Sequence, residues 1–182
     1  MIKYFENGGS KFKMREKKDI ITDKNVMKYA SDIETWIKDQ VAESNTDGIV
    51  LGMSGGVDSS TVARLCQEVG IKVHLIILPY GENMKNSKTY SNAMELINKF
   101  KFEYHIFDIK TAVDALVIQS EDKTNRAELA KANIRPRIRM TYLYEYAQIN
   151  NLLVIGTGNL SEATVRIFYK MGGWCTRHKP IS

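Results

Sequence analysis

Residues 48–60, GIVLGMSGGVDSS, decide the fold class of this 182-residue chain. The apolar run GIVL is typical of a buried β-strand, and TVARLCQEVG, which follows the stretch, has helical spacing and ends at Gly70, a suitable helix C-terminus. A strand, a glycine-rich turn and a helix in succession are typical of parallel α/β proteins. The stretch therefore predicts an α/β fold, and its turn is a candidate site.

The rest of the chain repeats this alternation of strand and helix. The run IKVHLIILP at 71–79 is almost continuously apolar, which suits a parallel strand buried on both faces. We predict a doubly wound parallel sheet in one domain, residues 23–182, preceded by an N-terminal arm, residues 1–22. The predicted strands are 48–53, 71–79, 102–109 and 151–156, and the predicted helices are 24–44, 59–69, 88–100, 111–119, 163–170 and 124–149, the last interrupted near Pro136.

Composition limits the environment and the partners. No apolar run approaches the roughly 20 residues of a membrane span, the N-terminus lacks the apolar core of a secretory signal, and Cys66 and Cys175 form no disulfide framework, so we expect a cytoplasmic protein. The net charge of +5 is concentrated in 11–18, 135–139 and 177–182. None of these segments has interleaved aromatic residues in an arrangement typical of RNA recognition, so we expect an anionic small molecule as partner and no membrane or nucleic acid.

Two chemistries could use the glycine-rich turn. Gly52-Met53-Ser54-Gly55-Gly56 satisfies G-x-S-x-G, the nucleophile turn of serine hydrolases. That interpretation needs a later histidine, and the only one after His105 is His178, near the end. His74 and His105 lie inside predicted strands, where we expect core or edge positions.

A phosphate-binding loop explains more of the stretch. Gly55 and Gly56 allow backbone N–H groups to approach an anion, and the helix that starts near Asp58 points its positive end at the same place. Asp58 would need a divalent cation such as Mg²⁺ between its carboxylate and a phosphate. The structural alternative is a plain turn in which Asp58 caps the helix. Hydroxyl donors would come from Ser54, Ser59 and Ser60.

Three motifs in order resemble a known family. SGGVDSS at 54–60 resembles the SGGxDS pyrophosphate loop of N-type ATP pyrophosphatases. NIRPRIRMTYLY at 133–144 and VIGTGNLSEATVRIFYK at 154–170 are similar to the N-x-x-A-R-x-R-M and V-x-G-T-x-N-x-x-E…F-x-K segments of ammonia-dependent NAD synthetases, and LPYG at 78–81 matches as well. The resemblance covers roughly residues 24–182 and implies an adenine-nucleotide alpha-hydrolase-like, Rossmann-like three-layer sandwich.

The resemblance also implies an activity and its residues. It implies a ligase of NAD biosynthesis, a homodimer that amidates deamido-NAD with ammonia through an adenylated intermediate, using ATP and Mg²⁺ and no enzyme nucleophile. Without the resemblance, Glu162 could be a helix cap, and Arg137 and Arg139 solvated charges. The implied roles are ATP binding by Ser54, Gly55, Gly56, Asp58, Ser59, Ser60 and Thr157, Mg²⁺ binding by Asp58 and Glu162, and deamido-NAD binding by Arg137 and Lys170.

The sequence also departs from the family pattern. Residues 82–93 lack the usual acidic, glutamine-containing stretch, Gly173 and Arg177 occupy usually acidic positions, and Arg166 replaces a glycine. The chain ends at Ser182, where family members continue, so we expect a sheet without its last strand and an apolar edge that a dimer would cover. Two alternatives stay open: a degenerate nucleotide-binding relative, and another N-type ATP pyrophosphatase with a different substrate.

Overall fold

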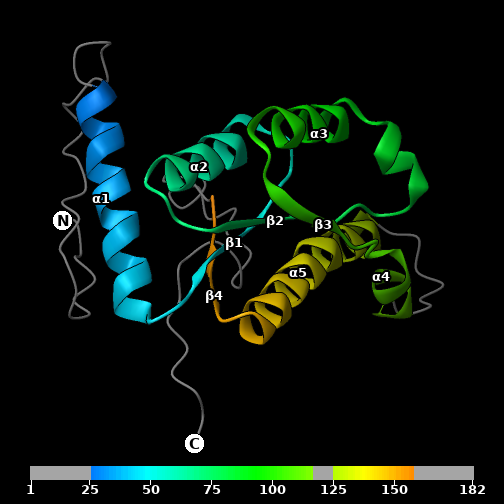
Figure 1. Ribbon diagram of the computed structural model, residues 1–182. Coiled ribbons are helices and arrows are strands. Elements are labelled where there is room, and N and C mark those ends of the chain that lie inside the picture. Colours follow the sequence, from blue (N-terminus) through cyan, green and yellow to red (C-terminus); the bar gives the residue numbers. More distant parts are fainter. Residues whose placement is uncertain (1–25, 117–124, 158–182) are drawn as a thin grey trace, which may run out of the picture.

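A four-stranded parallel sheet forms the centre of the computed structural model, which describes residues 26–116 and 125–157 (Figure 1). The strand order is β3-β2-β1-β4. The strands are β1 Gly48–Gly52, β2 Val73–Ile77, β3 Glu103–Ile106 and β4 Leu152–Ile155. The helices are α1 Val26–Ser44, α2 Val57–Glu68, α3 Lys88–Phe100, α4 Lys110–Leu116 and α5 Asn125–Ile149, with a short 3₁₀ helix, η1, at Glu82–Asn86.

Helices cover both faces of the sheet (Figure 1). Ile49 and Leu51 of β1 pack in one core with side chains of α1, α2 and α3. Val50, between them, belongs to a second core with side chains of α4 and α5. Because neighbouring residues of a strand point to opposite faces, this alternation produces three layers. The predicted doubly wound, three-layer α/β sandwich is therefore confirmed.

β2 and β3 differ sharply in burial. All five residues of β2 are buried, as its continuous apolar run predicts, whereas all four residues of β3 are exposed at the edge of the described sheet. His74 is a core residue and His105 is an edge residue, which confirms the expectation for both. β3 is shorter than the predicted strand 102–109, although the N–H groups of Phe107 and Ile109 still donate to the carbonyls of Ile77 and Pro79.

The predicted interruption of the long helix near Pro136 is wrong. α5 continues from Asn125 to Ile149 with Pro136 inside it. Proline removes one helical hydrogen bond and normally kinks or ends a helix. Here Ile134 and Ile138, on both sides of the proline, pack into the same core below the sheet, and this packing holds the two halves of α5 in one helix.

Other predictions lie outside the described residues, namely the arm 1–22 and the helix 163–170. The short helix predicted at 111–119 corresponds to α4 as far as Leu116. Among the described segments, no helix combines the length and apolar character that a membrane span requires.

Candidate active site

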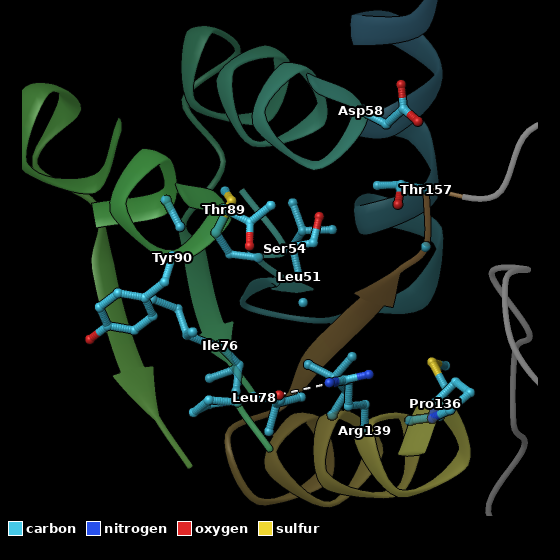
Figure 2. A pocket seen from close by; sticks show the side chains of 18 of the residues that line it. Leu51, Ser54, Asp58, Ile76, Leu78, Thr89, Tyr90, Pro136, Arg139 and Thr157 are labelled. Carbon is cyan, nitrogen blue, oxygen red and sulfur yellow. Dashed lines mark hydrogen bonds between the residues drawn. The ribbon is translucent and has the colours of Figure 1, made fainter. Parts of the chain in front are cut away.

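A cavity of about 660 Å³ opens at the carboxyl ends of β1, β2 and β4 (Figure 2). In open parallel sheets this is the place where ligands bind, and the volume suits a small-molecule ligand. Its walls come from the three strand ends, the glycine-rich loop, the start of α3 and one side of α5. The predicted site residues among its lining are Ser54, Asp58, Arg137 and Thr157.

The glycine-rich loop has a backbone that requires glycine at Gly55. Its φ of +77° is in the left-handed region, and a Cβ there would stand 1.9 Å from the carbonyl oxygen of Thr89 in α3. Gly56 follows in an extended conformation at the N-cap position of α2, and its N–H donates to Ser54 Oγ at 3.2 Å. The loop thus holds the positive end of α2 beside the cavity.

Asp58 does not cap α2. The helix begins at Val57, two residues before the predicted start, and no side chain accepts a hydrogen bond at its N-cap, Gly56. Asp58 lies in the first turn, is exposed, and is one of the residues that line the cavity (Figure 2). The alternative in which Asp58 only caps the helix is therefore wrong. Its position leaves carboxylate oxygens available to a cation at the anion-binding end of the helix.

The three serines of the loop have different surroundings. Ser54 is exposed and lines the cavity. Ser59 is buried, and its Oγ lies 3.1 Å from both Ser54 Oγ and the Gly56 carbonyl oxygen. Ser60 Oγ donates to the same carbonyl at 2.9 Å. The structure therefore brings Ser54 to the cavity, while the hydroxyls of Ser59 and Ser60 stabilise the loop by hydrogen bonds to the Gly56 carbonyl.

The serine-hydrolase alternative finds no base in the described part of the chain. His74 and His105, the two histidines described there, lie on β2 and β3 and do not line the cavity. Ser54 Oγ instead contacts Gly56 N–H and Ser59 Oγ. His178, the remaining histidine, lies outside the described residues.

Two arginines of α5 line the cavity opposite the loop. Arg137 is exposed, and its Nη1 donates to the Asn133 carbonyl of its own helix at 2.7 Å. Arg139 is half-buried, and its Nε donates to the Leu78 carbonyl at 3.0 Å (Figure 2). Burial, and to a smaller extent the charge of Arg135, lowers the pKa of Arg139 from its ordinary value. Arg139 is thus no solvated surface charge, and a weakly hydrated guanidinium of this kind suits an anionic ligand.

Sequence reasoning missed the wall beyond β2. Ser87, Thr89 and Tyr90, at the start of α3, line the cavity. Shortly after β2, outside the cavity lining, Tyr80 donates to Asp114 Oδ1 at 2.7 Å, and the Arg135 guanidinium stands 4.0 Å from the Tyr80 ring centre. Their place in the chain could have indicated them, because they follow the carboxyl end of β2, and ligands bind at the carboxyl ends of the strands in open parallel sheets.

Several residues of interest lie outside the described ranges. These are Glu162 and Lys170 of the predicted site, together with Arg166, Gly173 and Arg177, which depart from the family pattern. Thr157, two residues after the end of β4, is the last described residue and lines the cavity (Figure 2).

The chain is similar to a known protein family in both its sequence and its fold. Residues 29–182 match the family model described as NAD synthase. The chain belongs to the NAD synthase family. The NH(3)-dependent NAD(+) synthetase of Mycoplasma genitalium is 34% identical to it over 159 residues, which cover 87% of this chain and 63% of that protein. The enzyme of the same name from Campylobacter jejuni strain 81-176 is 38% identical over 127 residues, 70% of this chain and 50% of that protein.

Solved structures of similar proteins have the same fold. The NH3-dependent NAD synthetase from Campylobacter jejuni, solved with a nitrate ion, superimposes with a TM-score of 0.68 at 36% identity, covering 75% of this chain and 58% of that one. The NMN synthetase from Francisella tularensis gives a TM-score of 0.70 at 32% identity, covering 80% and 60%. The chain therefore spans less than two thirds of the length of these relatives.

Proposed function

We propose that this member of the NAD synthase family amidates deamido-NAD with ammonia to give NAD, at the expense of ATP. One observation carries the proposal: Ser54 and Asp58 of the glycine-rich loop, Arg137 of α5 and Thr157 after β4 line a single cavity. These are residues from all three motifs that resemble ammonia-dependent NAD synthetases. The names of the relatives support the same activity.

The reaction proceeds in two substitutions. The nicotinate carboxylate oxygen of deamido-NAD attacks the α-phosphorus of ATP, and pyrophosphate leaves with the electrons of the broken P–O bond. Ammonia then attacks the carbonyl carbon of the adenylate, AMP leaves, and the amide loses a proton to solvent. Neither step needs an enzyme nucleophile, so the protein contributes by positioning and by stabilising charge.

The described residues fit these tasks. Backbone N–H groups at the start of α2 and the hydroxyl of Ser54 stabilise the negative charge of the leaving pyrophosphate. Arg137, with Lys170, binds the dinucleotide substrate, and Arg139 adds a second guanidinium on the same wall. Gly55, Gly56, Ser59 and Ser60 shape the loop, and Thr157 contacts ATP from the end of β4.

Asp58 fits a magnesium ligand. Mg²⁺ prefers one or two carboxylates together with phosphate oxygens, and the exposed Asp58 lines the cavity from the first turn of α2. Asp58 and Glu162 would hold the ion, which when bound neutralises phosphate charge. The proposal also includes a homodimer and a cytoplasmic location.

The direct test is NAD and AMP formation by the purified chain with deamido-NAD, ATP, Mg²⁺ and ammonium. We expect Asp58→Asn to lower kcat/KM by about 100-fold or more, as loss of a charge-stabilising group does in other enzymes. Glu68→Gln is the matched control, because Glu68 is an exposed carboxylate at the other end of the same helix. We expect this control to keep the full rate.

Three other results would redirect the proposal. ATP binding through Asp58 without NAD formation would indicate a degenerate nucleotide-binding relative. Amidation of nicotinate mononucleotide in preference to deamido-NAD would indicate an NMN synthetase, the name of one structural neighbour. Equal rates for the natural chain and Asp58→Asn would contradict the assignment of the loop.

A further inference from the structure

Two histidines and a glutamate meet at the edge of the sheet, outside the candidate active site. His74 of β2 is the register partner of Glu103 of β3, so the two are neighbours on adjacent strands. His105 lies two residues after Glu103 and therefore on the same face of β3. Glu103 Oε1 is 3.2 Å from His74 Nδ1 and 3.9 Å from His105 Nε2. One nitrogen of each histidine and a carboxylate oxygen all lie within 4.8 Å of one another.

Tyr146 of α5 packs against both histidines of this cluster. Its hydroxyl lies 3.1 Å from His74 Nδ1, and its ring centre lies 5.3 Å from that of His105 and 5.8 Å from that of His74. The His74 side chain is only 4% exposed, whereas those of Glu103 and His105 are 50% and 43% exposed. The cluster thus has one buried ligand and two half-exposed ligands that solvent reaches.

The cluster is separate from the candidate active site. His74 lies in the amino-terminal half of β2, whereas the cavity begins at Ile76 and continues beyond the carboxyl end of that strand. No member of the cluster lines the cavity. An ion bound here would therefore act on the structure of the sheet edge.

We propose that His74, Glu103 and His105 bind a divalent transition-metal ion such as Zn²⁺. Two imidazole nitrogens and one carboxylate oxygen, with a water in the fourth position, are a typical zinc ligand set. With zinc–ligand distances of about 2.0–2.2 Å, neighbouring tetrahedral ligands stand about 3.3 Å apart. The His74–Glu103 distance already matches, whereas the 3.9 Å between Glu103 Oε1 and Nε2 of the half-exposed His105 has to shorten when the ion binds. Mg²⁺ and Ca²⁺ prefer oxygen ligands and fit poorly.

Neighbouring charges affect both the pKa of His74 and the availability of the Glu103 carboxylate. Desolvation by burial lowers the pKa of His74, with Glu103 opposing this shift and Lys72 and His105 adding to it. Lys72 Nζ lies 3.8 Å from Glu103 Oε2 and competes for the carboxylate. Burial also raises the pKa of the Tyr146 hydroxyl, which stays protonated.

The second nitrogen of His74 limits the affinity. Nε2 is buried and has no hydrogen-bond partner among the described residues. A metal at Nδ1 would leave the proton on Nε2 without an acceptor, and loss of such support typically costs about 10–100-fold in metal affinity. We therefore expect affinity about 10–100-fold below that of a zinc site with the same ligands and a complete outer shell.

The experiment is a Zn²⁺ titration of the whole purified chain by calorimetry, repeated in competition with a chromogenic chelator. We expect one equivalent to bind, and we expect Glu103→Gln and His105→Gln to weaken binding at least about tenfold. Both side chains are half-exposed, so these variants keep the fold, which circular dichroism checks. The visible spectrum of Co²⁺ in the same site reports whether the coordination is tetrahedral.

A second pair of possible ligands provides the matched control. Cys175 and His178 are separated by two residues and could bind zinc themselves. The double variant Cys175→Ser/His178→Gln removes them, and we expect it to bind Zn²⁺ as the natural chain does. Loss of binding in this control, unchanged affinity in Glu103→Gln and His105→Gln, or no zinc binding by the natural chain would each overturn the proposal.

Discussion

The carbonyl oxygen of Thr89 lies 1.9 Å from the point where a side-chain Cβ at Gly55 would stand. No real Cβ fits at that distance, so the glycine-rich loop packs backbone to backbone against the first turn of α3. Gly55 also has a φ of +77°, which other residues adopt only with strain. The two constraints together fix the shape of the loop that faces the cavity.

Gly55→Ala should therefore destabilise the protein and abolish ATP binding. The left-handed backbone alone costs about 1–2 kcal/mol for alanine, and the clash with Thr89 adds to it. Urea unfolding and ATP titration measure the two effects.

Gly70→Ala is the matched control for this glycine. Gly70 has nearly the same φ, +76°, but a Cβ added to it would meet no atom within 4 Å. We therefore expect only the backbone cost of about 1–2 kcal/mol, together with normal ATP binding. Equal losses of stability in both variants would show that the contact with Thr89 is not a constraint.

Arg139→Met should cost more stability than Arg137→Met. Arg139 donates to the buried Leu78 at the end of β2, and a buried carbonyl that loses its donor costs about 1–3 kcal/mol. Arg137 is exposed, and a substitution at an exposed position typically changes the free energy of unfolding by about 0.5 kcal/mol or less.

Both arginine variants should bind ATP or deamido-NAD more weakly, because both side chains line the cavity. Chemical denaturation and ligand titration separate the effect on stability from the effect on binding. If Arg139→Met matched the natural chain in its free energy of unfolding, the hydrogen bond to Leu78 would have no role in holding α5 to the sheet.

Ser87→Ala should weaken the start of α3. Ser87 is the N-cap of this helix, and its Oγ accepts a hydrogen bond from Tyr90 N at 3.2 Å. Loss of such a cap costs about 1 kcal/mol of unfolding free energy. Ser91→Ala, on an exposed position of the same helix, should be neutral or slightly stabilising. Thermal unfolding compares them, and the same melting temperature for both would argue against capping by Ser87.

Acid should destabilise the protein through His74 when a chelator keeps metals away. Burial lowers the pKa of His74 from 6.5, so below that value the unfolded chain binds a proton more readily than the folded one. This contribution to stability is complete above pH 6.5, is lost as the pH falls through the lowered folded pKa, and is constant below it.

The measurement is the free energy of unfolding as a function of pH, for the natural chain and for His74→Leu. The leucine keeps an apolar side chain of similar size in β2, so we expect its profile to be flatter in this range although its stability is lower. Parallel profiles for the two proteins would assign the acid effect to other groups.

Local sequence patterns predicted the elements whose pattern is typical of one kind of secondary structure. The apolar run of β2 and the helical spacing of α1 have one interpretation each, and the glycine-rich turn after β1 marked the side of the cavity that Asp58 occupies. The interruption predicted at Pro136 was wrong because packing on both sides of the proline outweighs its tendency to break the helix. A local sequence pattern contains no information on such packing.

Contacts between distant segments could not be predicted from local patterns. The bond from Arg139 to Leu78 joins residues that are 61 positions apart, and the stacking of Arg135 on Tyr80 is similarly remote. The pairing of His74 with Glu103 depends on strand register, which requires knowledge of the strand order. Such features depend on tertiary structure, and among these three the bond from Arg139 to Leu78 lies on the wall of the candidate active site.

The position of β4 has a consequence for the order in which the chain folds. The N–H of Asp47, just before β1, donates to the carbonyl of Asn151, just before β4, and the two residues are 104 positions apart. During synthesis β1 can pair with β2 early, but its other side stays open until more than a hundred further residues have been made. Pairing over such a separation is slow, and an unpaired strand edge invites association with other chains. Among the described strands, β1 is thus the first to be made and among the last to be paired on both sides.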